Sequence, residues 1–319
     1  MRQNDKIFVA GDDTLIGAAL LRQLKAQGYT ELVGQGASGP DLRNASSVDA
    51  FFAQRQPDYV LLAAGESGGI LANQRYPAQL MLDNLLVQTH IIHSAYCHGV
   101  TKLLYLASSC SYPKQAAQPL QVNSLLAGPL EPTNEAYAVA KLAGIKLCQA
   151  YRQQYQADFI VGIPANAFGV GDDFDPDNAH VIPALIRKMH QAKLEGQPVV
   201  EVWGTGMPRR EFIFADDLAD ACLFVMHNYS DSLPINIGGG TNISIRELAE
   251  LVKVVIGYDG LLNFDTSKPN GMPLKALDST QLLSLGWQPQ TDLKSAIEAT
   301  YQWFLSAFNH PTQKLMVHG

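Results

Sequence analysis

The sequence has few cysteines, no long apolar run and no excess of positive charge. Its four cysteines among 319 residues include no CxxC pair and no spacing typical of metal ligands, which argues against a disulfide framework and a metal site. No stretch of eighteen or more apolar residues occurs, and the N-terminus lacks the apolar core of a signal peptide. The net charge of −7 argues against a nucleic-acid partner, because phosphate binding requires an excess of Lys and Arg. We therefore expect a reduced, cytoplasmic globular protein with no membrane segment.

The first half of the chain alternates between strand-like and helix-like segments. Apolar strands are expected near 6–10, 31–35, 59–64, 102–109 and 158–165, and amphipathic helices near 16–28, 46–56 (with Ser46 or Ser47 as N-cap), 84–99 and 134–155. This alternation predicts an α/β protein with a doubly wound parallel sheet of the Rossmann type.

After about residue 165 the alternation stops. Helices are then expected near 180–193, 244–257 and 291–308, with short strands between them. We assign residues 1–165 to a dinucleotide-binding domain, joined by returning segments around 210–240. Residues 166–319 are assigned mainly to a smaller C-terminal lobe that binds substrate over the carboxyl edge of the sheet.

The stretch from Gly11 to Gly17, GDDTLIG, lies where a strand turns into a helix. It keeps the two outer glycines of a dinucleotide-binding fingerprint, but Thr14 replaces the middle one. Asp12, Asp13 and Thr14 are favourable N-cap residues, so we expect them to satisfy the first amides of the helix themselves. The carboxylates would then occupy the place of a bound pyrophosphate, which is held weakly, differently or not at all. The segment VGQGASG after the second predicted strand contains neither an acid that could bind the ribose hydroxyls of NAD nor an arginine that could bind the phosphate of NADP.

A second pattern points to carbonyl reduction. Tyr137 and Lys141 are four residues apart on a predicted helix and share one of its faces, and Ser108 ends a predicted strand. A nearby ammonium lowers the pKa of a phenol, so the tyrosine can donate a proton while the serine polarises a ketone. A lone YxxxK pair is more often a solvated helix face, and the serine at a strand end favours the functional interpretation.

Several longer motifs carry a resemblance to a known family. They include SSCSYPK, LEPTNEAYAVAKLAGIKLC, NAHVIPALIRK and VWGTGMPRREFIFADDLA. The chain resembles, almost end to end, the GDP-L-fucose synthase family of extended short-chain dehydrogenase/reductases. The resemblance implies epimerisation of a GDP-4-keto-6-deoxy sugar at C3 and C5, followed by NADPH-dependent reduction at C4. It also implies NADP(H) as cofactor, a GDP-linked keto-deoxy sugar as substrate, and a homodimer formed through the helices at 84–98 and 134–155.

The resemblance assigns roles by position. Ser108, Tyr137 and Lys141 match the reductase triad, Cys110 the epimerisation base and His180 its acid. The substrate-binding positions are Lys188, Trp203 and Arg210, and the cofactor-binding candidates are Gly11, Thr14, Ile16, Gly17, Asp41, Leu42, Ala63, Ala64, Lys141, Pro164 and Asn166.

The residue types suit an epimerase independently of the resemblance. A 4-keto group acidifies the protons at C3 and C5, so a thiolate or imidazole can remove one and an acid on the other face can return one. Two simpler interpretations stay open here. Cys110 could be a small buried filler, and His180 could cap the following helix.

The chain departs from the family pattern mainly around the cofactor. Asp13 stands at the position of an arginine and Glu66 at that of a lysine, while Asn270 and Leu274 replace an aspartate and an arginine. Two alternatives to the family reaction therefore stay open. The first is an epimerase that has lost reductase activity and cofactor binding, acting on a related sugar such as a heptose or a dideoxy sugar. The second is a non-catalytic homologue that binds a nucleotide sugar.

Overall fold

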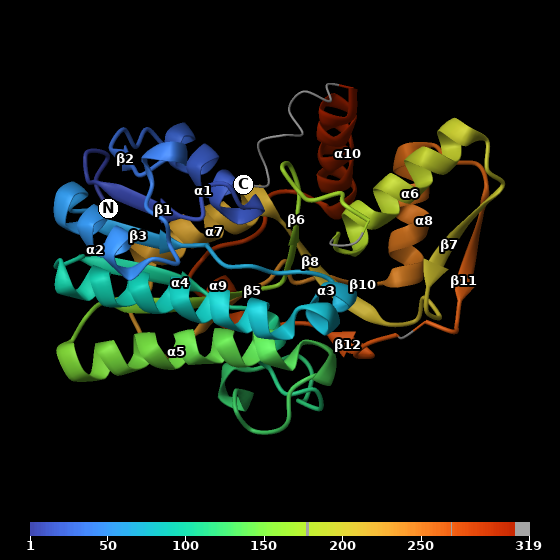
Figure 1. The fold of residues 1–319 in the computed structure, drawn as a ribbon. Coiled ribbons are helices and arrows are strands. Elements are labelled where there is room, and N and C mark those ends of the chain that lie inside the picture. Colours follow the sequence, from blue (N-terminus) through green and yellow to red (C-terminus); the bar gives the residue numbers. More distant parts are fainter. Residues whose placement is uncertain (177–178, 269, 310–319) are drawn as a thin grey trace.

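A six-stranded parallel sheet forms the centre of the larger lobe (Figure 1). The computed structural model describes residues 1–176, 179–268 and 270–309. The strands lie in the order β2-β1-β3-β4-β5-β9, with bounds β1 Ile7–Ala10, β2 Leu32–Val33, β3 Tyr59–Leu62, β4 Lys102–Leu106, β5 Phe159–Pro164 and β9 Ile235–Ile237. Every residue of β1, β4 and β5 is buried, as expected of strands that are covered on both faces.

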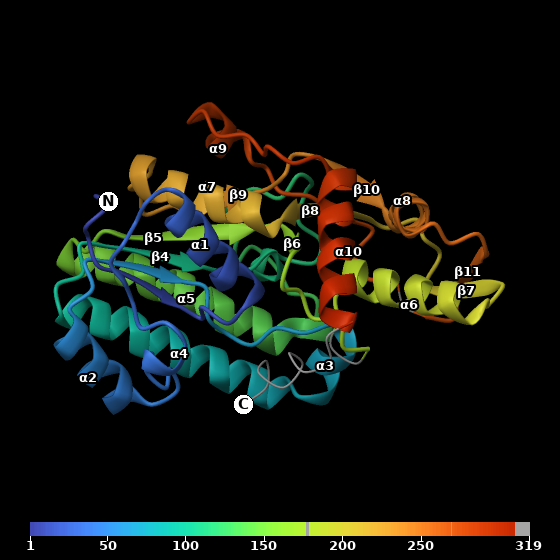
Figure 2. The same ribbon diagram turned by 90° about the horizontal axis from the view of Figure 1, so that it is seen from above.

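Helices cover both faces of this sheet, which Figure 2 shows from above. On one face α1 (Leu15–Ala26) packs against α7 (Ala215–Asn228). On the other face α4 (Pro77–Cys97) lies between α2 (Ala45–Arg55) and α5 (Glu135–Tyr155). This arrangement confirms the predicted doubly wound fold. Within the described ranges, no helix is both long and apolar enough to cross a membrane.

Two helices begin earlier than predicted. The N-cap of α2 is Asn44, whose side-chain oxygen accepts a hydrogen bond from the Ser47 amide at 3.0 Å, so the prediction of Ser46 or Ser47 as the cap is wrong. Such a cap contributes about 1 kcal/mol by satisfying an amide that has no partner within the helix. The helix predicted at 84–99 begins instead at Pro77, because a proline at the first helical position has no N–H to satisfy.

A second apolar core lies in the smaller lobe. Its helices are α6 (Val181–Glu195), α8 (Ile245–Ile256) and α10 (Leu293–Asn309), which bury side chains such as Met189 and Leu248 against one another. The remaining elements are β6 Asn166–Phe168, β7 Val199–Trp203, β8 Arg209–Phe214, β10 Asn242–Ser244, β11 Leu261–Asp265, β12 Leu274–Lys275 and the short helices α3 Ile70–Arg75 and α9 Thr280–Ser284. The boundary between the two predicted domains stays a prediction.

Strand β8 ties the smaller lobe to the larger one. It pairs with β6, which follows β5 almost directly, and also with β10 and β12. The carboxylate of Glu211 on β8 is buried and accepts hydrogen bonds from the amides of Gly240 at 2.8 Å and Leu277 at 2.6 Å. These bonds fix the chain after β9 and after β12, so β12 reaches the carboxyl edge of the main sheet.

The strand order reverses beside β1. Strand β2 pairs with one edge of β1 and β3 with the other, and the chain leaves β1 in opposite directions toward them. In open α/β sheets a ligand binds in the crevice that such a reversal opens at the carboxyl ends of the strands. Gly11 directly follows β1 and Ala63 directly follows β3, so their backbone lies at this crevice.

Candidate active site

The turn between β1 and α1 requires both of its outer glycines. Gly11 has φ +88°, in the left-handed region, and a Cβ there would lie 2.6 Å from the Ala64 Cα. A Cβ on Gly17 would overlap the carbonyl oxygen of Gly11. The glycines therefore let α1 start directly against the strand. This confirms that the strand-to-helix turn needs the two outer glycines.

Thr14, and not the two aspartates, caps α1. The Thr14 hydroxyl accepts a hydrogen bond from the Gly17 amide at 3.0 Å and donates to the Gly11 carbonyl at 2.7 Å. The carboxylate of Asp12 turns away to accept from the Gly36 amide at 2.7 Å, and Asp13 is exposed. The expectation that carboxylates occupy the helix N-terminus is therefore wrong. Thr14 was expected to be a cap, and it is one.

Two amides at this helix start keep no internal partner. Leu15 and Ile16 occupy the first helical positions, where an N–H has no carbonyl four residues earlier within the helix. Among the described residues, no side chain accepts from either amide. The positive end of the helix dipole adds to their attraction for an anion. This donor set fits a diphosphate, so the residues present fit a dinucleotide despite the missing middle glycine.

The other predicted cofactor residues lie at the same edge of the sheet. Ala63 and Ala64 follow β3, Pro164 ends β5 and Asn166 begins β6, where its side chain donates to the Glu211 carbonyl at 2.9 Å. Asp41 and Leu42 lie in the turn before α2 and are exposed and half-buried, respectively. The structure thus distributes these positions along the crevice from β2 to β5. Their roles in binding stay predictions.

The three predicted reductase residues meet where β4 ends and α5 begins. Ser108 follows β4, and Tyr137 and Lys141 lie one helical turn apart on α5 with the Lys141 Nζ 5.9 Å from the Tyr137 ring centre. Burial raises the pKa of Tyr137 and the nearby Cys110 raises it further, while a hydrogen bond with Ser108 opposes this. Burial lowers the pKa of Lys141 to about 8. Tyr137 is consequently protonated at neutral pH, as a proton donor must be.

Cys110 lies beside this group within a set of hydrogen-bond donors. Its sulfur accepts from Asn134 Nδ2 at 3.1 Å and from Lys275 Nζ at 3.3 Å, and its amide donates to Ser108 Oγ at 3.2 Å. Burial disfavours the thiolate, but the Lys275 ammonium and the hydrogen bonds outweigh it and lower the pKa of the thiol. These donors distinguish Cys110 from a thiol in purely apolar surroundings, where burial raises the pKa. Its role as the epimerisation base stays a prediction.

His180 lies at the start of α6, close enough to Lys275 for their charges to interact. It occupies the N-cap position, as the simpler interpretation predicted, but its side chain makes no capping hydrogen bond within the described residues, so the imidazole is not used by the cap. His180 is exposed. Desolvation lowers its pKa, and the Lys275 ammonium lowers it further while Asp173 opposes both. Lys275 thus acts electrostatically on both Cys110 and His180.

The predicted substrate-binding residues divide into two places. Lys188 and Trp203 are both exposed, and the Lys188 ammonium lies 5.7 Å from the centre of the indole. Lys268, which the sequence motifs did not single out, lies 5.4 Å from the same ring. Arg210 instead donates to the carbonyl of Met272 at 2.6 Å and lies close enough to Cys110 for the two charges to interact.

Arg209 serves a different purpose from Arg210. Its guanidinium donates to the side chain of Asn242 at 2.6 Å and pairs with Glu247 at 3.1 Å. These bonds attach β8 to the N-terminus of α8. Arg209 is therefore committed to the fold, and Arg210 alone of the two arginines faces the thiol.

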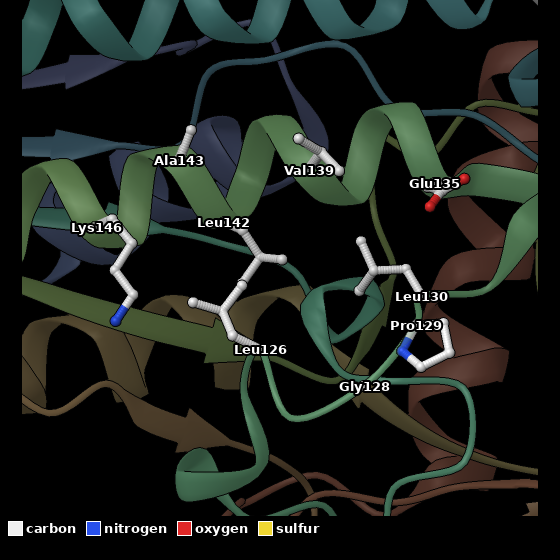
Figure 3. A pocket seen from close by; sticks show the side chains of 9 residues that line it. All are labelled: Leu126, Gly128, Pro129, Leu130, Glu135, Val139, Leu142, Ala143 and Lys146. Carbon is white, nitrogen blue, oxygen red and sulfur yellow. The ribbon is translucent and has the colours of Figure 1, made fainter.

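An apolar cavity of about 410 Å³ lies away from this cluster (Figure 3). It is formed by the outer face of α5, with Val139 and Leu142, and by a loop that includes Leu126 and Leu130. None of the predicted catalytic side chains lines it. The catalytic residues gather on the sheet side of α5 instead, so this cavity is not the candidate active site.

Sequence reasoning missed Lys275, Asn134 and Lys268. Asn134 lies inside a quoted motif, and Lys268 and Lys275 lie close to the noted positions Asn270 and Leu274. None of the three belongs to a recognisable chemical spacing with Cys110 or Trp203. The distance in sequence is the reason, since 165 positions separate Lys275 from Cys110. Only the pairing of β12 with β8 brings the lysine to the thiol.

The fold and this site define a class of protein. A Rossmann sheet with Ser, Tyr and Lys at its carboxyl edge is the arrangement of a short-chain dehydrogenase/reductase. The chain belongs to the NAD dependent epimerase/dehydratase family, whose model matches residues 7–238.

Named relatives lie within this family. The chain is 53% identical over 300 residues to GDP-L-fucose synthase 1 of Arabidopsis thaliana. The matched region covers 94% of this chain and 93% of that protein. Among solved structures it is similar to a GDP-6-OMe-4-keto-L-xylo-heptose reductase from C. jejuni, with a TM-score of 0.91, 34% identity and coverage of 96% and 99% of the two chains. It is also similar to a GDP-L-fucose synthetase from Naegleria fowleri bound to NADP, with a TM-score of 0.89, 30% identity and coverage of 97% of each chain.

Proposed function

We propose that this protein epimerises a GDP-linked 4-keto-6-deoxy sugar at C3 and C5 and then reduces its C4 carbonyl, as in GDP-L-fucose synthesis. One observation carries the proposal: the thiol of Cys110 lies against the Ser108, Tyr137 and Lys141 group and within reach of the Lys275 ammonium. A reductase alone does not require an activated thiol. The thiolate of Cys110 as base serves the epimerisation, and the hydroxyl of Tyr137 as proton donor serves the reduction of the same keto group. The named GDP-L-fucose synthase relatives support this assignment.

The epimerisation follows from the charges around Cys110. The thiolate removes the acidic proton from C3 or C5, and the electron pair moves onto the C4 oxygen as an enolate. Ser108 and Tyr137 donate hydrogen bonds toward that oxygen, which stabilises its developing charge. His180 returns a proton to the opposite face of the carbon. The centre is inverted without any oxidation or reduction.

The reduction uses the same carbonyl. When bound, a nicotinamide dinucleotide, NADPH by resemblance, would supply the hydride for C4. Tyr137 gives its phenolic proton to the C4 oxygen, so the ketone becomes an alcohol. The Lys141 ammonium, 5.9 Å from the centre of the Tyr137 ring, stabilises the resulting phenolate. By resemblance, Lys141 would also bind the nicotinamide ribose. The amides of Leu15 and Ile16 would hold the diphosphate.

We further propose that the nucleotide end of the substrate lies over Trp203. The exposed indole offers a flat apolar face, and the ammonium groups of Lys188 and Lys268 lie near it. Such a site can attract the diphosphate and pack against a sugar or a base. Arg210 lies close enough to Cys110 for their charges to interact, so it can contact the part of the substrate that is closer to the reacting ring.

A homodimer formed through α4 and α5 is also part of the proposal. The two helices pack side by side on one face of the sheet, and their outer surface exposes Val139, Tyr96 and Tyr155. These apolar and aromatic groups are not explained by packing against the sheet. The cavity of Figure 3 lies on the same surface. All four cysteines are free thiols, which supports a reducing compartment such as the cytoplasm.

The two half-reactions can be separated by two variants. Cys110→Ser should slow the exchange of C3 and C5 protons into deuterated water by about 10²- to 10⁴-fold, while leaving reduction of an already epimerised GDP-4-keto sugar within a fewfold of the parent rate. Tyr137→Phe should abolish C4 reduction, because the proton donor is lost, and should slow exchange much less, because Ser108 still donates to the C4 oxygen of the enolate. Exchange is followed by NMR and reduction by the loss of nicotinamide absorbance.

The outcomes distinguish the alternatives. Exchange without any reduction in the parent protein would leave an epimerase that has lost its reductase step. Sugar binding without exchange or reduction would leave a non-catalytic homologue. Either result contradicts the proposed two-step function.

A further inference from the structure

The carboxylate of Asp12 lies at the carboxyl end of β2, although Asp12 itself follows β1. Its Oδ2 accepts a hydrogen bond from the Gly36 amide at 2.7 Å. Strands β1 and β2 are parallel neighbours with Phe8 opposite Val33, so the turn after one strand faces the turn after the other. The hydrogen bond fixes a negative charge across the edge between them.

This edge is where a dinucleotide-binding sheet distinguishes its cofactors. A carboxylate after the second strand accepts hydrogen bonds from the adenosine ribose hydroxyls of NAD, whereas an arginine there pairs with the 2′-phosphate of NADP. Residues 34–40 contain neither a carboxylate nor a basic side chain. Asp12 supplies the missing carboxylate from the neighbouring turn. The sequence could not show this, because the residue lies outside the segment where such an acid is sought.

The charges around Asp12 further disfavour the 2′-phosphate of NADP. Asp13 is adjacent and exposed, and adds a second negative charge. The nearest basic residue along the chain after β2 is Arg43, which lies 4.0 Å from the carboxylate of Asp83. Gly36 has no atom within 4 Å of the place where a Cβ would stand, so the backbone at this edge is open to a ligand.

We propose that Asp12 makes the dinucleotide site selective for NAD(H) over NADP(H). The inference rests on the proposed reductase function and refines its cofactor. A ribose hydroxyl can donate to the free lone pairs of the Asp12 carboxylate, while a 2′-phosphate brought to the same place meets a like charge. The selectivity would separate this chain from the fucose synthetase of Naegleria fowleri, whose structure contains NADP.

The test is a calorimetric titration of the full-length protein with NADH and with NADPH, without sugar. We expect NADH to bind at least tenfold more tightly. Asp12→Asn keeps an acceptor for the Gly36 amide and removes the charge, so it should tighten NADPH binding severalfold and narrow the difference between the two cofactors. Asp13→Asn is the matched control, because it removes an adjacent exposed charge that makes no hydrogen bond to Gly36.

Three results overturn the inference, and they are distinguishable. NADPH binding as tight as that of NADH removes the selectivity and leaves the reductase proposal intact. If NADH binds more tightly than NADPH and Asp12→Asn leaves that difference in affinity unchanged, Asp12 does not cause the selectivity. No binding of either dinucleotide at millimolar concentration removes the inference together with the reductase half of the proposed function.

Discussion

The ammonium of Lys275 lies 3.3 Å from the sulfur of Cys110, although 165 positions separate them in the chain. Parallel pairing of β12 with β8 places Lys275 opposite Arg210, and the buried carboxylate of Glu211 holds the Leu277 amide just beyond it. The contact therefore depends on β8, which lies outside the regular alternation of strands and helices in the first half of the chain. Its chemical consequence is a thiol with a lowered pKa beside the reductase residues.

Lys275→Met should shift the pH dependence of proton exchange. Removing the ammonium leaves burial as the main influence, so the pKa of Cys110 rises and the thiolate is scarce at neutral pH. We expect C3 and C5 exchange at pH 7 to slow by about tenfold or more, since each pKa unit changes the thiolate fraction tenfold. The rate should recover as the pH is raised. Lys275→Arg retains the charge and serves as control, and an unshifted pH profile in the Met variant would contradict the assigned effect.

Gly17→Ala should weaken both folding and dinucleotide binding. Alanine normally stabilises a helix relative to glycine by about 1 kcal/mol, but here its methyl group would overlap the Gly11 carbonyl. We expect a net loss of about 1–3 kcal/mol in the free energy of unfolding, because the turn has to move. Denaturant unfolding and calorimetric cofactor titration measure the two effects. The control is Gly196→Ala, at a left-handed position with open space, which should cost some stability and leave cofactor affinity unchanged.

Asp172→Asn should make the protein relatively more stable as the pH rises. Burial raises the pKa of this carboxyl to about 7, against hydrogen bonds from backbone amides, and its Oδ2 has no hydrogen-bond partner among the residues that the structure describes. In the unfolded chain the group titrates near 4, so its ionisation costs folded-state stability progressively between about pH 4 and pH 7. Asparagine cannot ionise and avoids this cost. The stability of the variant relative to the parent should increase by about 2–4 kcal/mol across that window.

Urea unfolding at pH 4.5, 6 and 8 measures this difference. Asp259→Asn, at an exposed carboxyl, is the control and should show no such trend. A constant difference between the Asp172 variant and the parent would mean that the carboxyl is already ionised in the folded protein at low pH.

Val139→Arg should dissociate the proposed dimer. Val139 is exposed on the outer face of α5 and lines the cavity of Figure 3, so a charge there would be buried against a second copy. Analytical ultracentrifugation should give about twice the 34.7 kDa chain mass for the parent and the single-chain mass for the variant. Leu194→Arg, at an exposed leucine on α6, is the matched control and should leave the dimer intact. A monomeric parent would contradict the proposed interface.

The sequence determined the larger lobe because its signals are local. Apolar strands that alternate with amphipathic helices have few ways to bury both faces of a sheet, so the doubly wound fold follows from their order. The outer glycines Gly11 and Gly17 were also predictable, since the strand-to-helix turn leaves no room for a side chain. Tyr137 and Lys141 were placed on one helix face by their spacing alone.

Only the tertiary structure decided where charges from distant segments meet. Asp12 and Asp13 have the same side chain and equal capping propensity, yet the first bonds to Gly36 in the turn after β2, the second is exposed, and Thr14 caps the helix. The environment of Cys110 likewise required the β8–β12 pairing that delivers Lys275. The physical reason is that a hydrogen bond or an ion pair acts over a few ångströms in space. The pattern of residues along a chain specifies periodicity and turns, and it does not specify which distant side chains come within that range.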